Sequence, residues 1–260
     1  MSGRAISRTT ENNISICQLH SAAIMSLEKK YGIDILYEDN HLVVLNKGVS
    51  DIVQGDQTGD ESLDQKLREF IRERDAKPGN VFVGIPHRLD RPVSGVMVYT
   101  KTGKALSRMT ALFREKEIEK IYYAIVETQP SPLAARLEHY ITRNTRQNKS
   151  YCHTKEVRDS KHAVLEYRYL GVSEHYHLLE ILLETGRHHQ IRAQLAAIGL
   201  PIKGDIKYGA KKPNINGGIS LHARRISFIH PVKRKPLEIT APFPRGDIFP
   251  YFKTDQGARL

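Results

Sequence analysis

One aspartate, Asp90, lies between Arg88 and Arg91 in the stretch PHRLDRPVSG of a strongly basic chain. The chain carries 40 Lys and Arg against 29 Asp and Glu, which gives a formal net charge of +11 at pH 7. Dispersed positive charge is typical of a surface that binds a polyanion, and a carboxylate on that surface weakens the contact. Asp90 therefore either caps a turn or pairs with a neighbouring arginine, or it reacts with a molecule that the basic surface recruits.

A second stretch, EKIYYAIVE, combines a cation with aromatic side chains on one predicted strand. Successive strand residues point to opposite faces, so Tyr122 and Tyr123 separate, and Lys120 shares a face with Tyr122. An aromatic ring on a basic surface can stack an unpaired nucleic-acid base. The alternative is that both tyrosines are ordinary strand residues.

A third stretch, TGRHHQIRAQL, places cations where a strand ends and a predicted helix begins with residues 187–192. The later apolar face of that helix comprises Ile191, Leu195 and Ile198. Cations at a helix N-terminus meet positive partial charge, so Arg187 and Arg192 imply a neighbouring anion. That anion is either a nucleic-acid phosphate or Asp90.

Metal and nucleotide cofactors lack their usual motifs. No cysteine or carboxylate completes a ligand set with the paired His188 and His189, or with His175 and His177, and no Walker loop or G-x-G-x-x-G follows a strand. We expect no metal and no cofactor. The two cysteines are isolated from each other, which argues against a disulfide framework.

Hydrophobic periodicity predicts an α+β fold with a mixed, mostly antiparallel sheet, because strands dominate and strict β-α-β alternation is missing. Predicted strands cover residues 33–38, 41–46, 81–85, 95–100, 121–128, 162–172, 176–184, 219–230 and 237–243, and predicted helices cover 62–77, 104–117 and 188–200. Residues 1–24 have no period and predict a flexible extension, with Met25 a possible true start, and residues 25–260 predict one domain. The chain has neither an apolar run long enough for a membrane span nor a secretory signal, so we expect a cytoplasmic monomer.

Together, these stretches resemble the RluA-type family of RNA pseudouridine synthases. HRLDRPVSG is similar to the family motif H-R-L-D-x-x-x-S-G and KIYYA to K-x-Y-x-A, while TGRHHQIR and GLPIKGDIKYG are similar to two further motifs in the same order. The resemblance extends from about Ile33 to Pro244. Two departures are the absence of a proline after Lys47, where the family often has N-K-P-x-G, and too few residues before Ile33 for the S4-like RNA-binding domain of many relatives. We therefore expect a minimal member with only the catalytic domain.

The resemblance implies a pseudouridine synthase fold around a basic cleft and isomerisation of a uridine in structured RNA, ribosomal or transfer, without a cofactor. It assigns Asp90 as the catalytic carboxylate and places Tyr122 against the target base, where the ring stacks and helps to remove the C5 proton, with Tyr123 in the core. A buried carboxylate needs a permanently charged partner, which we assign to Arg192 with Arg187 as the second candidate.

RNA contacts are assigned to the remaining basic residues. The target uridine must be flipped out of its stack, and Arg88 is placed to fill the gap. The full predicted RNA-binding set is His87, Arg88, Arg91, Lys120, Arg187, His189 and Lys203. Two alternatives remain: a non-catalytic RNA-binding protein of the same fold, and a ribonuclease using His188 and His189, which residues adjacent on a helix make difficult because they point about 100° apart.

Overall fold

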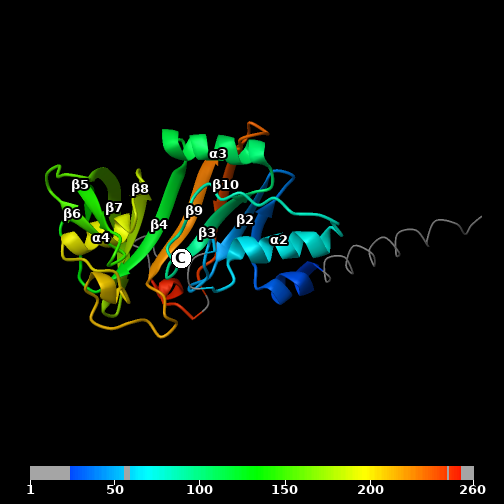
Figure 1. Ribbon diagram of the computed structural model, residues 1–260. Coiled ribbons are helices and arrows are strands. Elements are labelled where there is room, and N and C mark those ends of the chain that lie inside the picture. The colour runs from blue at the N-terminus through cyan, green and yellow to red at the C-terminus, as the bar shows by residue number, and fades with distance from the viewer. Residues whose placement is uncertain (1–23, 56–58, 245, 253–260) are drawn as a thin grey trace, which may run out of the picture.

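Ten strands form one sheet in the order β1-β2-β3-β9-β4-β8-β7-β5-β6, with β10 paired to β9 (Figure 1). This computed structural model describes residues 24–55, 59–244 and 246–252. The strands are β1 (Ile35–Glu38), β2 (Leu42–Lys47), β3 (Ser94–Thr100), β4 (Glu119–Val126), β5 (Ala134–Asn144), β6 (Lys149–His153), β7 (Lys161–Ser173), β8 (Tyr176–Leu183), β9 (Leu221–Ile229) and β10 (Pro236–Thr240). The helices are α2 (Leu63–Arg74), α3 (Gly103–Glu115) and α4 (Gln190–Ala197), with short 3-10 turns at Ile206–Tyr208 and Phe249–Tyr251. The extension predicted for residues 1–24 lies outside the described residues except for residue 24, which belongs to a helical segment ending at residue 31.

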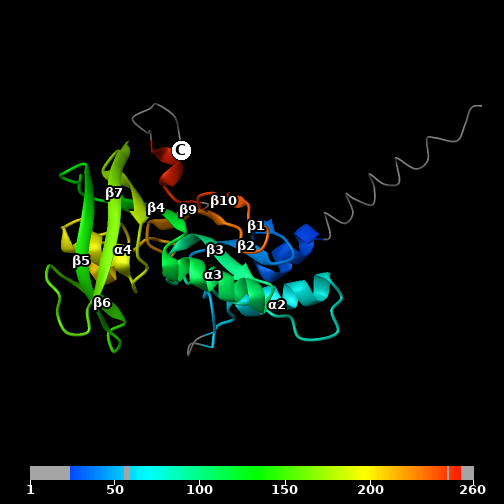
Figure 2. The same ribbon diagram turned by 90° about the horizontal axis from the view of Figure 1, so that it is seen from above.

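The predicted fold class is confirmed. All strand pairs are antiparallel except β3 with β9, which run parallel at Ser94 opposite His222. Antiparallel hairpins join β1 to β2 and β7 to β8. Strand β9 contacts β3, β4 and β10, so it joins the end of the sheet with β1–β3 to the end with β5–β8 (Figure 2).

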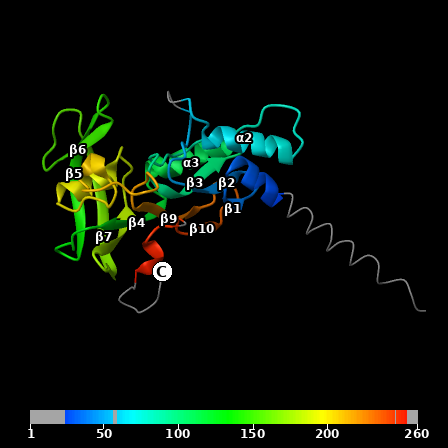
Figure 3. The ribbon, with the colours of Figure 1, turned by 90° about the horizontal axis from the view of Figure 1, so that it is seen from below.

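The helices cover both sides of the sheet. Helix α2 packs against the side of β2 that carries Val43 and Leu45, whereas α3 packs against the opposite side, which carries Leu42 and Val44. Ser62 and Gln65 have the spacing of a capping box, and both reciprocal contacts form at the start of α2. At the other end of the sheet, α4 lies beside β5–β7 (Figure 3), and its Ile191 belongs to the same core as α2.

The strand predicted at 81–85 is wrong. Only one bridge forms there, between Gly84 and Thr100, because the next amide on that edge of β3, that of Val98, donates to the ring of His87 instead of to a backbone carbonyl group. The helix predicted from residue 187 begins later, at Gln190, and Ile198, expected on its apolar face, follows its last turn and is exposed. The apolar spacing along residues 104–117 predicts four inward-facing residues; in α3 only Met109 of these is fully buried, whereas Leu106, Leu112 and Phe113 are partly buried.

The hairpin β5–β6 was not predicted from the sequence. Along β5 partly buried and exposed residues alternate, and only Ile141 is fully buried. A half-buried strand is predicted from alternating apolar and polar residues. The sequence of β5 does not alternate in this way, because most of its residues are polar. This hairpin nevertheless contacts the site described next.

Candidate active site

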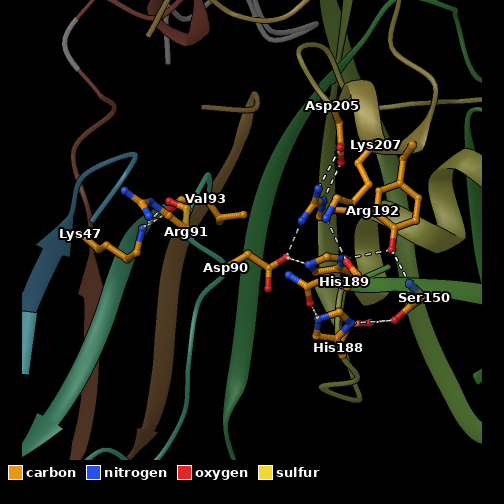
Figure 4. Close-up of polar contacts among 12 residues, drawn as sticks. Lys47, Asp90, Arg91, Val93, Ser150, His188, His189, Arg192, Asp205 and Lys207 are labelled. Atoms are coloured by element: carbon orange, nitrogen blue, oxygen red, sulfur yellow. Dashed lines mark hydrogen bonds and ion pairs between the residues drawn. The ribbon is translucent and has the colours of Figure 1, made fainter. Parts of the chain in front are cut away.

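Asp90 lies in the loop that leads into β3, and a buried lysine holds that loop in place. The Nζ of Lys47 donates hydrogen bonds to the carbonyl oxygens of Gly48 at 2.9 Å, Arg91 at 3.0 Å and Val93 at 2.7 Å (Figure 4). Burial lowers the pKa of Lys47 to about 8, partly offset by Asp51 and Asp90. Two carbonyl groups of the Asp90 loop therefore share one ammonium group, which fixes the backbone on both sides of Pro92.

Glycine is required where the loop becomes β3. Gly95 has φ +115, and a Cβ there would lie 2.2 Å from the carbonyl oxygen of Ala223. Only a residue without a side chain lets β3 and β9 approach so closely at this point. The parallel contact of β3 with β9 therefore sets the position from which Asp90 projects.

The carboxylate of Asp90 pairs with Arg192, the first of the two candidate partners. The Nη1 of Arg192 lies 3.1 Å from Oδ2 of Asp90, while its Nε and Nη2 donate to the two oxygens of Asp205 at 2.6 and 2.9 Å. Asp205 and Arg192 are almost fully buried, whereas the side chain of Asp90 is 27% exposed. Burial opposes the charge of Arg192, but Asp205 and then Asp90 raise its pKa above the usual value. Asp205 therefore fixes the guanidinium group of Arg192, and the remaining Nη1 of that group contacts Asp90.

Arg187, the second candidate, points elsewhere. Its Nε donates to the carbonyl oxygen of His162 at 2.9 Å, and it lies before the helix rather than in its first turn. The prediction that Arg187 begins the helix is therefore wrong, and the electrostatic argument for a neighbouring anion does not apply to this residue. Arg192, which is within the helix, does have the anionic neighbour that the argument required.

His189 lies directly beside Asp90. Its Nε2 is 3.5 Å from Oδ2 of Asp90, and its Nδ1 is 3.0 Å from the hydroxyl oxygen of Tyr208. Burial, reinforced by the charge of Arg192, lowers the pKa of His189 to about 2, so the ring is neutral. A buried and neutral ring is not a phosphate-binding cation, and the RNA-binding role of His189 stays a prediction.

A cavity of about 690 Å³ opens above these groups. Tyr122 of β4 lines it and is 9% exposed, and burial, together with Asp90, raises the pKa of its phenol above the usual value. Lys120 lines it too, with a pKa lowered to about 8 by burial and by Lys116. The lining contains more cations than carboxylates; the cations are Arg88, Arg114, Lys116, Lys120, Arg143, Arg187 and Arg192, and the carboxylates are Asp90 and Glu184.

The predicted RNA-binding residues fall into different environments. Arg88 lines this cavity, is exposed, and makes no hydrogen bond or ion pair within the described part of the chain. Arg91 is exposed and pairs with Asp60 at 2.9 Å. His87 also lines the cavity, but burial and Lys120 lower its pKa to about 3 and its Nε2 accepts a hydrogen bond from the Val98 amide.

Arg91 does not line this cavity, and neither does Lys203. Its Nζ donates to Asn214 at 2.6 Å and lies over the ring of Tyr176. Tyr123, expected in the core, is half-buried and packs against Phe243 on the other side of β4. The two tyrosines therefore do separate to opposite faces, as the strand period predicts.

The ribonuclease alternative finds no support in the geometry, although for a different reason than the sequence suggested. His188 and His189 precede the helix, and their rings stack with centroids 3.8 Å apart. Both nitrogens of His188 already have partners, Ser150 at Nδ1 and Asn148 at Nε2, and burial lowers its pKa. No ring nitrogen of His188 is therefore free to exchange a proton with a substrate.

Sequence reasoning missed three residues of this site: Lys47, Asp205 and Tyr208. Asp205 and Tyr208 lie in the quoted motif GLPIKGDIKYG. The signal available there was a single acid soon after the predicted helix that carries Arg187 and Arg192.

Within the described ranges, no three His, Cys, Asp or Glu side chains are grouped to hold a metal ion. In the same ranges, no helix has both the length and the apolar character needed to cross a bilayer.

Comparison with known proteins places this site in a family. Residues 41–197 match the family model described as RNA pseudouridylate synthase. The chain is 32% identical over 225 residues to an uncharacterized RNA pseudouridine synthase of Bacillus subtilis (strain 168), covering 85% of this chain and 73% of that protein. It is 31% identical over 223 residues to the ribosomal large subunit pseudouridine synthase D of Zymomonas mobilis, covering 82% and 70%.

A solved structure, human RNA Pseudouridylate Synthase Domain Containing 4, superposes with a TM-score of 0.69 at 23% identity, covering 87% of this chain and 93% of that one. This likeness supports the pseudouridine synthase fold. The chain belongs to the RNA pseudouridine synthase family, whose members are isomerases. Its motifs and its relatives place it among the RluA-type members, and it spans about two thirds of the length of several curated relatives.

Proposed function

We propose that this protein converts a uridine of structured RNA into pseudouridine with Asp90 as the catalytic carboxylate. The observation that carries the proposal is the Asp90–Arg192–Asp205 cluster at the base of a basic cavity. A guanidinium group stays protonated at any ordinary pH, so it supplies a permanent positive charge beside the carboxylate of Asp90. A non-catalytic RNA-binding protein would have no need for this cluster.

The reaction breaks the bond between N1 of uracil and C1′ of the sugar and forms a bond between C5 and C1′. The C5 proton is lost and N1 gains a proton, so the product is an isomer of the substrate. An ionised carboxylate can either capture C1′ or remove the 2′ proton as the base departs. In the described residues only Oδ2 of Asp90 has side-chain partners, which leaves Oδ1 for either step.

Tyr122 is assigned to stacking against the uracil ring. Its ring lines the cavity on the strand next to β9, and the raised pKa keeps the phenol protonated. Removal of the C5 proton by Tyr122 would need the phenolate, which that pKa disfavours. The stacking role is therefore the better supported of the two roles expected from the sequence.

The RNA must present the uridine outside its stack, because the cavity cannot accept a base that remains paired. Arg88, exposed and without a partner among the described residues, is free to enter the space that the base leaves. Several relatives are named for the ribosomal large subunit. Large-subunit ribosomal RNA is therefore the first substrate to test, ahead of transfer RNA.

The test is release of tritium from RNA labelled at C5 of uridine. Wild type, Asp90→Asn and the matched control Asp159→Asn, which changes an exposed aspartate that does not line the cavity, are incubated with ribosomal and transfer RNA from cells lacking the protein. We expect release by wild type and the control and none by Asp90→Asn. Binding without release by wild type would favour the RNA-binding alternative, and equal release by all three would show that Asp90 is not the catalytic carboxylate.

A further inference from the structure

A chain of polar contacts leads from the β5–β6 hairpin to Asp90. The amide of Ser150 donates to the hydroxyl oxygen of Tyr208 at 2.8 Å, and that hydroxyl lies 3.0 Å from Nδ1 of His189. The opposite ring nitrogen, Nε2, faces Oδ2 of Asp90 at 3.5 Å (Figure 4). Each of these residues comes from a different part of the sequence, so only the folded sheet brings them together.

Counting donors and acceptors determines which atom carries each hydrogen in this series of polar contacts. Tyr208 has one O–H, and its oxygen already accepts from the Ser150 amide. If Nδ1 of His189 also donated to this oxygen, the O–H would have no acceptor within the described part of the chain. The arrangement that satisfies every group has Tyr208 donating to Nδ1, so the neutral ring carries its hydrogen on Nε2.

We propose that His189 is a positioning residue for Asp90: Tyr208 holds it in the Nε2–H tautomer, and its N–H, with Arg192, fixes Oδ2 so that Oδ1 faces the substrate. This inference rests on the proposed function. Nη1 of Arg192 donates to Oδ2 at 3.1 Å and Nε2 of His189 faces the same oxygen from 3.5 Å, so rotation of the carboxylate group would disturb both contacts. The neutral state of the ring, favoured by its burial, lets it donate without adding a second cation beside Arg192.

A structural role for His189 makes different demands. The residue precedes α4 with φ 52 and ψ 28, a left-handed conformation that Asn adopts more readily than Gln, and its side chain makes no capping hydrogen bond. Its ring is 7% exposed and stacks on His188, which a phenyl ring could reproduce. If the backbone or the packing mattered most, Asn or Phe would therefore replace His189 best.

Positioning predicts the reverse order. The side-chain NH2 of Gln reaches about as far as Nε2, whereas that of Asn reaches only about as far as Nδ1, and Phe donates nothing. We expect His189→Gln to keep most of the wild-type kcat for tritium release, and His189→Asn and His189→Phe to lose roughly 10- to 100-fold in kcat, as expected for a lost hydrogen bond to a charged group, with KM for RNA unchanged. Asn or Phe activity equal to wild type, or a Gln variant as slow as Phe, would overturn the proposal.

A second measurement needs no activity. In protein with ¹⁵N-labelled histidine, the ring nitrogens of His189, assigned by their loss in His189→Asn, should show the Nε2–H tautomer from pH 5 to 8. Tyr208→Phe should lose that preference together with part of kcat. An Nδ1–H tautomer or a charged ring in wild type would refute the positioning role even if Asp90 is catalytic, whereas wild type that releases no tritium would refute the proposed function and leave the tautomer to be judged by this spectrum.

Discussion

Replacing Asp205 by Asn tests whether a buried carboxylate holds the charge that Asp90 depends on. Asp205 accepts two hydrogen bonds from Arg192, at 2.6 and 2.9 Å, and its side chain is 1% exposed. Removing one partner of a buried ion pair costs about 3–5 kcal/mol, because the other charge stays buried. The Asn carbonyl keeps one of the two acceptors and Asp90 remains near Arg192, so we expect the lower end, about 3 kcal/mol.

Urea unfolding gives that free energy, and thermal unfolding should show a midpoint roughly 6–12 °C lower, at about 2–4 °C for each kcal/mol in a domain of this size. The matched control is Glu180→Gln, which breaks a 2.6 Å pair with the exposed Arg168 and should cost less than about 1 kcal/mol. In Asp205→Asn, Arg192 loses one of its two fixed acceptors and can move relative to Asp90, so kcat for tritium release should also fall about 100-fold. A variant within about 0.5 kcal/mol of wild type would refute the view that Asp205 holds the guanidinium group.

Three further perturbations probe the surroundings of the site. Gly95→Ala should destabilise by about 3 kcal/mol or more in urea unfolding because its Cβ meets the Ala223 backbone, while Gly103→Ala, with open space at the start of α3, should change stability by less than about 1 kcal/mol; equal effects would contradict the close approach of β3 and β9. Lys47→Met leaves carbonyl groups of the Asp90 loop without their donor, so we expect a loss of about 3 kcal/mol and slower tritium release, and an unchanged rate would show that the loop needs no such support. Burial lowers the pKa of His222 to about 4, so the unfolded chain takes up the proton first; stability is complete above about pH 6.5 and falls by up to about 3 kcal/mol toward pH 4, and His222→Gln should flatten that part of the curve of unfolding free energy against pH.

The features predicted correctly from the sequence are those that depend on residues close together in the chain. Strands such as β7 and β8 alternate or run apolar, and α2 begins at a capping box, so local pattern was enough to find them. Asp90 was identified because an acid in a basic loop is unusual, and its motif gave it a role. Arg192 was found through the rule that a cation near a helix start needs an anion.

The remaining features depend on contacts that no local pattern encodes. Asp205 and Tyr208 become part of the site only because α4 and the turn after it pack against the hairpin β5–β6, and that hairpin is stabilised by pairing with β7 rather than by its own apolar residues. His189 was assigned to RNA binding, whereas in the structure it is buried beside Arg192 and its ring is neutral. In each case the role of the residue is set by tertiary contacts, which the residue type and its sequence neighbours do not show.

The central place of β9 has a consequence for how the chain is assembled during synthesis. Every strand except β10 precedes β9 in the sequence, yet β9 pairs with β3, about 128 residues earlier at Ser94 and His222, as well as with β4. Pairing across such distances must bear a large loop-closure entropy, which makes folding slow. While the ribosome is still adding residues before Leu221, the two ends of the sheet have no strand between them, and the facing edges of β3 and β4 are open to wrong partners. The carboxylate of Asp90 and the guanidinium of Arg192 therefore meet late, after nearly the whole domain has emerged.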